Sequence, residues 1–327
     1  MQRILKVGDL KYVLINLLGE GASCSVYKGF CLSDEDKKML AIKIYKLENK
    51  NHLEKEIYIN SILPKEYFLS ILSYGTGYIY LASTINNDDC DIQNKEEVYF
   101  KIEELCENGD LFEYIYNTKM GFPEEISAKI FVNILKLVKI LHSKSFVHKD
   151  IKPENILIGN DFSLKLIDFG FSQEIDERNN NLIYSMEGTE RYCPPETKKG
   201  YYKGYDGIKS DIFSLGVLLF VLTGKIFPFY LCSCSDKRYR LIMTKKYDLF
   251  WSSFKNYYFS DDFKDLINHL ICHNPSDRFD ICQIFQHPWI QKNCSDKDLD
   301  ESCIFNEDVA NEFKKRKQLW NSKDSLN

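Results

Sequence analysis

The chain has 327 residues, of which 44% are hydrophobic, 28% charged and 14% aromatic, and its formal net charge is −5. Plentiful aromatic residues and the lack of a sustained heptad exclude a disordered, collagen-like or coiled-coil protein. The negative charge disfavours a nucleic-acid-binding surface, which is usually basic. A chain of this length has room for two domains and buries enough surface to fold without crosslinks.

Eleven cysteines are present, an odd number, and their spacing shows no paired framework. Residues 1–10 lack a signal-sequence pattern, so we expect reduced thiols in a cytoplasmic or nuclear protein. Cys232 and Cys234 are too close together and too isolated for a zinc site. The longest apolar stretch, Leu215–Leu222, has eight residues. A bilayer requires about 20, so we expect no membrane attachment.

The first hundred residues predict a sheet-rich region with one helix. The helix is Leu53–Leu63, ended by Pro64, and Thr84–Glu97 is a polar loop. The predicted strands are short β-branched or aromatic runs bounded by turn residues. They are Lys11–Leu18, Val26–Phe30, Met39–Tyr45, Tyr78–Ser83 and Val98–Glu103.

Past Gly109 the hydrophobic spacing becomes that of helices. One predicted helix is apolar all round, which indicates burial, and we expect it to end at Gly224. The predicted helices are Ile126–Leu141, Asp211–Thr223, Phe263–Cys272 and Ile281–Phe285. The layout is therefore a small sheet-rich part followed by a larger helical part.

The last part of the chain has a different character. Asn293–Ser302 is a polar linker, and Asn306–Ser322 predicts a helix with Val309, Phe313 and Trp320 on one side. Its basic run, residues 314–317, suits calmodulin or another regulatory protein, or docking of the tail on the rest of the chain. A solvated helix face with one docking aromatic residue is the plainer alternative. We find no EF-hand loop, so calcium control would need another chain.

Two short motifs in the sheet-rich part suggest phosphate binding. Gly19 and Gly21 lie between two predicted strands, where glycines let backbone amides approach a phosphate closely, although a simple hairpin turn has the same pattern. Lys43 follows on the third strand amid apolar neighbours and needs a counter-charge. Glu56 on the predicted helix is the natural partner, with Glu54 as second choice. A lysine extending from an edge strand into water is the alternative.

A second set of motifs follows in a fixed order. His148-Lys149-Asp150-Ile151-Lys152-Pro153-Glu154-Asn155 comes first, and Asp168-Phe169-Gly170 follows an apolar strand, Leu164–Ile167. Gly188-Thr189 and Pro194-Pro195-Glu196 come next, before the buried helix. Each motif alone fits an ordinary turn or loop. Their combination in this order does not.

The sequence resembles the eukaryotic protein kinases over residues 10–291, and that motif set is highly specific. Lys152 and Gly188-Thr189 resemble the serine/threonine branch. The Asp211–Val217 segment, Arg278 and His287-Pro288-Trp289 look most like the calcium/calmodulin-dependent kinase group. The resemblance implies an α+β, bilobal kinase fold, with a β-rich N-lobe at about 10–105, a mainly helical C-lobe at about 106–291 and a tail, 292–327, that is a candidate for regulation.

The resemblance also implies ATP and Mg²⁺ as cofactors and a role for each matching residue. Lys43, held by Glu56, would grip the α- and β-phosphates, and Asn155 and Asp168 would hold Mg²⁺. Asp150 would accept the proton of the substrate hydroxyl, Lys152 would steady the γ-phosphate, and Thr189 would tie the peptide-binding loop to Asp150. The remaining nucleotide-binding residues would be Gly19, Gly21, Val26, Ala41 and Leu157, the hinge from Glu104 to Cys106, and Asp110 at the ribose. Glu196 and Arg278 would form a structural ion pair.

Several residues depart from the family pattern. Cys24 stands at the third glycine of the phosphate loop, which predicts a stiffer loop with activity retained. Lys149 replaces an arginine, so phosphorylation of the nearby loop is less strictly required, with Ser185 the first candidate and Tyr184 and Thr189 weaker ones. Glu103 falls at the gate of the adenine pocket and needs a donor, for which Lys43 is the first candidate, unless the alignment is shifted by one residue.

Three further expectations concern regulation and function. Asn60 puts a polar group where the family has a leucine, which makes regulated activity plausible. Asp110 and Glu154 would flank the peptide groove and favour arginine or lysine upstream of the acceptor Ser or Thr. We therefore expect an active serine/threonine kinase that acts on protein substrates. The alternative is a pseudokinase scaffold of the same fold, disfavoured because Lys43, Asp150, Asn155 and Asp168 are all present.

Overall fold

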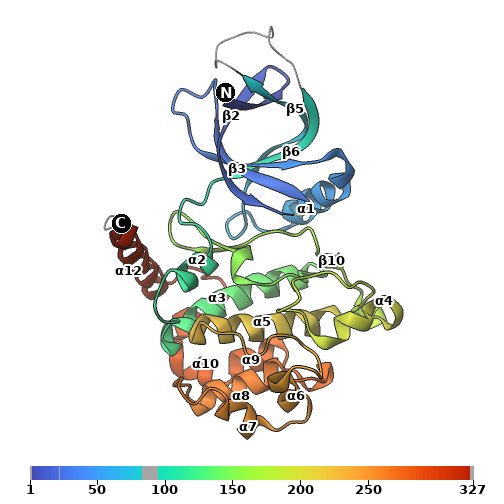
Figure 1. The fold of residues 1–327 in the computed structure, drawn as a ribbon, viewed down its shortest axis with the longest axis vertical. Coiled ribbons are helices and arrows are strands. Elements are labelled where there is room, and N and C mark those ends of the chain that lie inside the picture. The colour runs from blue at the N-terminus through green and yellow to red at the C-terminus, as the bar shows by residue number, and fades with distance from the viewer. Residues whose placement is uncertain (1, 22, 83–94, 325–327) are drawn as a thin grey trace. The chain divides into compact units, whose positions relative to one another are not determined.

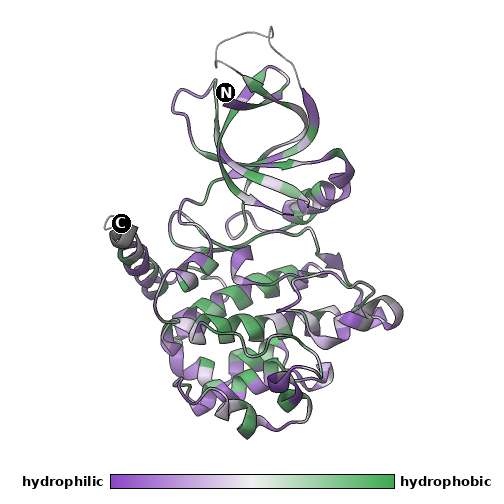
Figure 2. Cartoon of the chain, in the orientation of Figure 1, coloured by the Kyte–Doolittle hydropathy of each residue, from purple (hydrophilic) through white to green (hydrophobic). Residues whose placement is uncertain are grey.

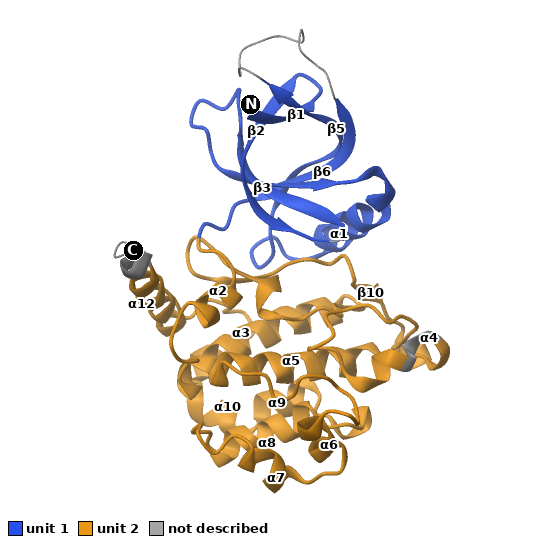
Figure 3. Cartoon of the chain, viewed as in Figure 1, with its two compact units in different colours: residues 1–107 blue, residues 108–327 orange. Residues whose placement is uncertain are grey.

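The computed structural model describes residues 2–21, 23–82 and 95–324, and it divides into two compact units. The N-terminal unit is Met1–Glu107 and the C-terminal unit is Asn108–Asn327 (Figure 3). Most of the predicted loop Thr84–Glu97 and all of Ser83 lie outside the described residues.

The N-terminal unit is a closed six-stranded antiparallel barrel with one long helix (Figure 1). The strand order around it is β1-β2-β3-β4-β6-β5, and β1 pairs with both β2 and β5 to close it. The helical elements are η1 (Leu47–Asn49) and α1 (Lys50–Ile62). The strands are β1 (Gln2–Val7), β2 (Leu10–Glu20), β3 (Cys24–Cys31), β4 (Leu40–Tyr45), β5 (Ile71–Ala82) and β6 (Glu96–Glu104).

Two strands differ from the sequence prediction. β1 was not predicted, and β5 begins at Ile71 rather than Tyr78. β1 is six residues long, and its pairing with β2 and β5 rather than its composition defines it. In β5, Gly75 and Gly77 hide the strand signal, because glycine disfavours strands in isolation.

The two faces of β4 and β6 pack against different parts of the N-terminal unit. Leu40 and Ile42, with Phe100 and Ile102, belong to the hydrophobic core of the barrel. Successive side chains in a strand point to opposite faces, so residues 41, 43 and 45 and residues 99, 101 and 103 lie on the other face. Helix α1 lies on that outer face, with Leu53 and Ile59 buried, and it ends where Leu63, extended before Pro64, breaks the helical backbone.

The C-terminal unit is mainly helical, with short strand pairs beside the long helices (Figure 1). Its first half contains α2 (Leu111–Tyr116), α3 (Glu124–Ser143), β7 (Phe146–Val147), η2 (Pro153–Asn155), β8 (Ile156–Ile158), β9 (Leu164–Leu166), β10 (Gln173–Glu174), η3 (Glu177–Asn179), β11 (Leu182–Ile183), η4 (Pro195–Lys199), α4 (Gly200–Lys203) and β12 (Tyr205–Asp206). Its second half contains α5 (Gly207–Gly224), α6 (Lys237–Met243), α7 (Tyr247–Ser252), α8 (Asp261–Leu270), η5 (Pro275–Asp277), α9 (Ile281–Gln286), α10 (Pro288–Asn293), α11 (Asp296–Leu299) and α12 (Glu307–Asp324).

Helix α5 is the core helix of the C-terminal unit, and its hydrophobic colour runs along its length (Figure 2). Asp206 caps its first turn by accepting from the backbone of Ile208 and Lys209. It ends one residue later than predicted, because Lys225 rather than Gly224 takes the left-handed conformation that stops the helix. Among the described helices, α5 alone is long and apolar enough to cross a membrane, but 78% of that window is buried inside the unit. Burial in the core therefore explains its composition.

The chain after Trp289 is folded onto the C-terminal unit. The predicted polar linker Asn293–Ser302 contains a short helix, α11, and Lys136 of α3 donates to the carbonyl oxygens of Asp298 and Cys303 at 2.6 Å. Helix α12 lies against α2 and α3, with Val309 and Phe313 buried (Figure 1). Of the three alternatives for the tail, self-docking is the arrangement found.

Candidate active site

The N-terminal unit holds a buried group of charged residues beneath α1. Lys43 on β4 donates to the Glu56 carboxylate at 3.1 Å, which is the ion pair the sequence predicted, and Tyr45 donates to the other oxygen of Glu56 at 3.1 Å. Glu54, the second choice, instead pairs with Lys50 on the exposed side of α1. Burial raises the pKa of Glu56, but Lys101 and Lys43 outweigh it and lower the pKa to about 2.

Glu103 has a different partner from the one expected. Its carboxylate lies 2.8 Å from Lys101 Nζ, whereas Lys43 Nζ is 3.9 Å away. Lys101 was not singled out in the sequence, and it also pairs with Glu56. The reason is the strand register, because Lys101 and Glu103 lie two residues apart on β6 and therefore share a face.

The two glycines lie where the hairpin of β2 and β3 turns. Gly19 pairs with Val26 across the ladder, and the Gly21 amide donates to the Cys24 carbonyl at 2.9 Å. A Cβ atom at Gly19 would meet nothing within 4 Å, so packing inside the unit does not require this glycine. The space above its backbone fits the expected approach of a ligand.

The other residues predicted to bind nucleotide lie at ordinary strand and loop positions. Ala41 on β4 pairs with Glu103 on β6, and β6 ends at Glu104, whose carboxylate accepts from the Ser70 amide at 3.1 Å. Cys106 follows in the segment that leaves the N-terminal unit. In the C-terminal unit, Leu157 on β8 forms a bridge with Asp110, which caps α2 by accepting from the Glu113 amide.

Asp150 is the centre of a compact hydrogen-bonded group in the C-terminal unit. Its Oδ1 accepts from the Thr189 backbone amide at 2.8 Å and from the Thr189 hydroxyl at 2.6 Å. Its Oδ2 lies 2.7 Å from Lys152 Nζ, which also donates to Thr189 Oγ1. Burial raises the pKa of Asp150, but the hydrogen bonds from Lys152 and Thr189 prevail and hold it below its ordinary value. Asp150 is therefore ionised at neutral pH.

Asn155 and Asp168 have the donor types that Mg²⁺ prefers, which are hard oxygens. Asn155 commits its Nδ2 group to Asp150, at 2.8 Å from the backbone oxygen and 3.0 Å from Oδ2, which leaves its amide oxygen for a metal. The Ile167 amide donates to the Asn155 carbonyl, and this hydrogen bond places the next residue, Asp168, close to Asn155. Asp168 holds a left-handed backbone with φ of 66°, a conformation that non-glycine residues adopt mainly at special sites. These residues fit the expected metal.

Asp211, which was not assigned a role from sequence, supports the loop that carries Asp150. Its buried carboxylate accepts from the backbone amides of His148 and Lys149 at 2.8 and 2.9 Å, and from the His142 ring. The His148 ring then contacts the Ile167 carbonyl and packs on Phe169. One aspartate on α5 thus orients the loop that carries Asp150.

Lys149 has a built-in acidic partner. Its Nζ lies 2.6 Å from the carboxylate of Glu187, which is two residues after Ser185. Gly188, the next residue, has φ of +120°, and a Cβ there would lie 2.6 Å from the Lys149 carbonyl oxygen. Only glycine fits this close approach, which places Thr189 beside Asp150. Phosphorylation of Ser185 stays a prediction.

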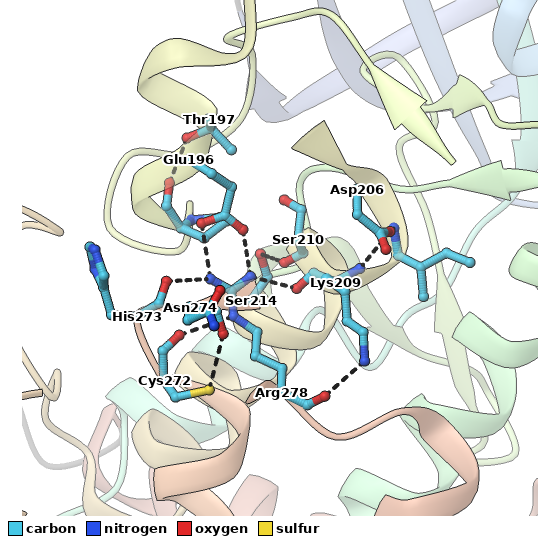
Figure 4. Close-up of polar contacts among 12 residues, drawn as sticks. Glu196, Thr197, Asp206, Lys209, Ser210, Ser214, Cys272, His273, Asn274 and Arg278 are labelled. Atoms are coloured by element: carbon cyan, nitrogen blue, oxygen red, sulfur yellow. Dashed lines mark hydrogen bonds and ion pairs between the residues drawn. The ribbon is translucent and has the colours of Figure 1, made fainter. Parts of the chain in front are cut away.

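The expected pair of Glu196 and Arg278 is present, with the Arg278 side chain fully buried and Glu196 partly exposed. Both guanidinium NH groups bond to the carboxylate, at 2.5 and 2.9 Å. Figure 4 shows the same side chain donating to the backbone carbonyls of Lys209 and Cys272. Arg278 thereby joins η4, α5 and the segment after α8.

Comparison with known proteins identifies the family. The family model described as "Protein kinase domain" matches residues 12–290. The chain belongs to the protein kinase family.

Individual relatives agree with this assignment. CBL-interacting protein kinase 10 of Oryza sativa subsp. japonica is 28% identical over 86% of the chain and 57% of its own length. CBL-interacting serine/threonine-protein kinase 18 of Arabidopsis thaliana is 31% identical over 86% of the chain and 50% of its own length. Serine/threonine-protein kinase kin-29 of Caenorhabditis elegans is 32% identical over 62% of the chain and 24% of its own length. The chain thus spans about half the length of the first two relatives.

Three residues that matter in this kinase were missed from sequence, and each had a detectable signal. Lys101 is a lysine inside a strand, at even spacing from Glu103. Glu187 is a carboxylate directly before the glycine of the Gly188-Thr189 motif. Asp211 is a charge in an otherwise apolar helix, and a buried charge requires partners.

Proposed function

We propose that this kinase is catalytically active and transfers the γ-phosphate of Mg·ATP to Ser or Thr hydroxyls of protein substrates. The observation that carries the proposal is the Asp150 group, in which Thr189, Lys152 and Asn155 hold an ionised carboxylate by both oxygens. A non-catalytic scaffold has no need for this arrangement.

The geometry supports a positioning mechanism. Asp150 orients the substrate hydroxyl and accepts its proton as the oxygen bonds to the γ-phosphorus and the bond to the ADP oxygen breaks. Lys152, beside Asp150, meets the charge on the transferred phosphoryl group, and Lys43 holds the α- and β-phosphates. Mg²⁺ held by Asn155 and Asp168 would neutralise charge on the phosphate oxygens. Because Thr189 is hydrogen-bonded to Asp150, the loop expected to bind the peptide is held beside the base.

Transfer to peptides is the direct test of activity. We expect labelled γ-phosphate to pass from Mg·ATP to Ser/Thr peptides, and Asp150→Asn to lower kcat by about 10²-fold or more, because a positioned base contributes that much. Asp248→Asn, an exposed acid on α7, is the matched control and should leave kcat unchanged. Nucleotide binding without transfer, in the native chain and in a Ser185→Glu form, would favour the pseudokinase instead.

We further propose that the substrate carries arginine or lysine upstream of the acceptor. Burial raises the pKa of Asp110, and the nearby carboxylates of Glu113 and Glu154 raise it further, so three acidic side chains lie close together. Glu154 also has a buried Oε2 atom without a hydrogen-bond partner among the described residues. A buried acceptor of this kind is costly unless a ligand donates to it, and a guanidinium is the donor that fits a carboxylate best.

A peptide library tests this preference. We expect arginine at upstream positions to be selected, and Glu154→Gln to raise the KM of an arginine peptide about tenfold while leaving an alanine-substituted peptide unaffected. Glu190→Gln is the control, because Glu190 is an exposed acid that pairs loosely with Lys198. Selection of acidic or proline-directed peptides would refute the preference.

The finer affiliation and the partner of the tail are also proposals. The Asp211–Val217, Arg278 and His287–Trp289 motifs support the calcium/calmodulin-dependent group, and the names of the plant relatives record interaction with CBL. A regulatory protein that took the tail, calmodulin included, would have to compete with the docked position of α12, where Phe313 and Arg316 are buried. The side of α12 open to such a protein would be that of the exposed Lys314, Lys315 and Leu319.

A further inference from the structure

Two lysines and two glutamates form a buried cluster on the outer face of the barrel, beneath α1. The exposed side-chain fractions are 9% for Lys43, 2% for Lys101, 3% for Glu56 and 2% for Glu103. Their formal charges sum to zero. The Lys43–Glu56 pair belongs to the expected phosphate-binding machinery, whereas Lys101 and Glu103 are additional.

The strand register makes the second lysine unusual. Lys43 on β4 lies directly opposite Lys101 on β6. Two like charges at directly opposed positions destabilise a sheet. Here the same oxygen of Glu56, Oε2, accepts from both ammonium groups, so a single residue of α1 bridges the two lysines, and Glu103 supplies the second negative charge. The cluster thus ties α1 to two adjacent strands instead of one.

Within the cluster, Lys101 makes the stronger contacts. It pairs closely with both carboxylates, Glu56 and Glu103, while Lys43 lies 3.1 Å from Glu56 and 3.9 Å from Glu103. Of the two lysines, Lys101 also does more to lower the pKa of Glu56. If Lys43 turned toward a phosphate, Glu56 would still be paired with Lys101.

We propose that Lys101 is a positioning residue that holds Glu56, and with it helix α1, on the barrel whether or not Lys43 is engaged elsewhere. If Lys43 were the only lysine beside Glu56, helix α1 would depend on that single ion pair to stay on the barrel. Here two lysines, on two adjacent strands, hold the same carboxylate of the helix. The second anchor offsets the polar Asn60, which is buried on the same helix where apolar packing would otherwise help to hold it.

The proposal deepens the proposed function, but its main test does not require phosphoryl transfer. Hydrogen–deuterium exchange of the α1 amides reports the position of the helix directly. A Glu103→Gln background removes the carboxylate that loss of Lys101 would otherwise leave unpaired, so that Lys101→Met alone does not bury a lone carboxylate. In that background, Lys43→Met and Lys101→Met are made singly and together, which gives a double-mutant cycle.

We expect each single lysine substitution to leave α1 exchange within about twofold of the background, and the double substitution to speed it about tenfold or more. Amides of β6 and the midpoint of thermal unfolding serve as controls for global unfolding. If Lys43→Met alone speeds α1 exchange as much as the double substitution, Lys101 is no anchor. If the double substitution leaves exchange unchanged, other contacts hold the helix, and the proposal is equally wrong.

Kinetics provide a second readout that simple packing would not move. With Lys43 occupied by phosphate, Glu103→Gln/Lys101→Met should lower kcat about tenfold relative to Glu103→Gln, with the KM for ATP little changed. Equal kcat in the two variants would show that Lys101 only neutralises Glu103. If no variant and not even the native chain transfers phosphate, the proposed function fails while the exchange result still stands.

Discussion

At the scale of single residues, Asp110 is the clearest case of an environment setting a side chain's chemistry. Burial raises the pKa of Asp110 to about 6, opposed by the hydrogen bond from the Glu113 amide, while the charges of Glu113 and Glu154 raise it further. The folded chain therefore binds this proton more tightly than the unfolded chain does. Ionising Asp110 costs the folded state stability as the pH rises from about 4 to about 6.

The same pKa predicts how recognition of a basic peptide depends on pH. As the pH falls from 7 to 5, Asp110 gains a proton and loses the charge that attracts an arginine. We expect the KM of an arginine peptide to rise about fivefold over this range, the size of one partly exposed ion pair. Asp110→Asn keeps the helix cap, because asparagine caps as well as aspartate, and should remove this pH dependence. An unchanged pH profile in that variant would contradict the prediction.

At the scale of elements, a buried cation, Arg316, helps to hold helix α12. Arg316 donates to Thr118 Oγ1 and the Gly121 carbonyl at 2.9 Å, and it lies 3.5 Å from the ring centre of Phe122. It pairs with Glu312 within the helix at 2.8 Å. The basic run that suggested calmodulin therefore has its central arginine buried in the turn between α2 and α3.

Truncating this arginine should detach the tail. We expect Arg316→Ala to lower the free energy of unfolding by about 2–3 kcal/mol, because buried carbonyl oxygens lose their donor. Lys315→Ala, next along the same helix with a side chain 70% exposed, should cost less than about 0.5 kcal/mol. Chemical denaturation measures both. Equal effects would mean that Arg316 does not anchor α12.

At the scale of the whole molecule, contacts between segments far apart in sequence decide which local motifs become a site. Arg278 joins the end of the Pro-Pro-Glu motif at Glu196 to the start of α5 and to the segment after α8 (Figure 4). Asp211, on the same helix α5, holds the catalytic loop. The large helical unit is thus tied together beneath Asp150 by two buried charges.

Breaking the ion pair of Arg278 with Glu196 should lower the stability of the folded chain. Glu196→Ala leaves the Arg278 guanidinium enclosed without its carboxylate, and removing one partner of a buried pair costs about 3–5 kcal/mol. We expect a clear fall in the midpoint of thermal unfolding. Glu190→Ala removes an exposed acid from the same loop and should shift the midpoint little. Similar midpoints for the two variants would show that the pair contributes no stability.

The sequence by itself determined the order of the motifs, the type of the long elements and several contacts. The predicted helices around α3, α5, α8 and α9 are confirmed. The hydrophobic period of α3 is long and regular, whereas α5 was recognised by being apolar all round. The predicted pairs of Lys43 with Glu56, Thr189 with Asp150, and Glu196 with Arg278 are present. Each of these residues belongs to a motif whose chemistry requires a partner.

Only the tertiary structure decided the closure of the barrel by β1, the partner of Glu103 and the surface on which α12 packs. A lysine such as Lys101 within a strand is compatible with an exposed face or a buried one, and the sequence does not say which. The packing of α1 on that face buries the lysine and selects its carboxylates. The physical reason is general. Local spacing encodes the period of an element, whereas burial and charge pairing depend on which distant segment covers it.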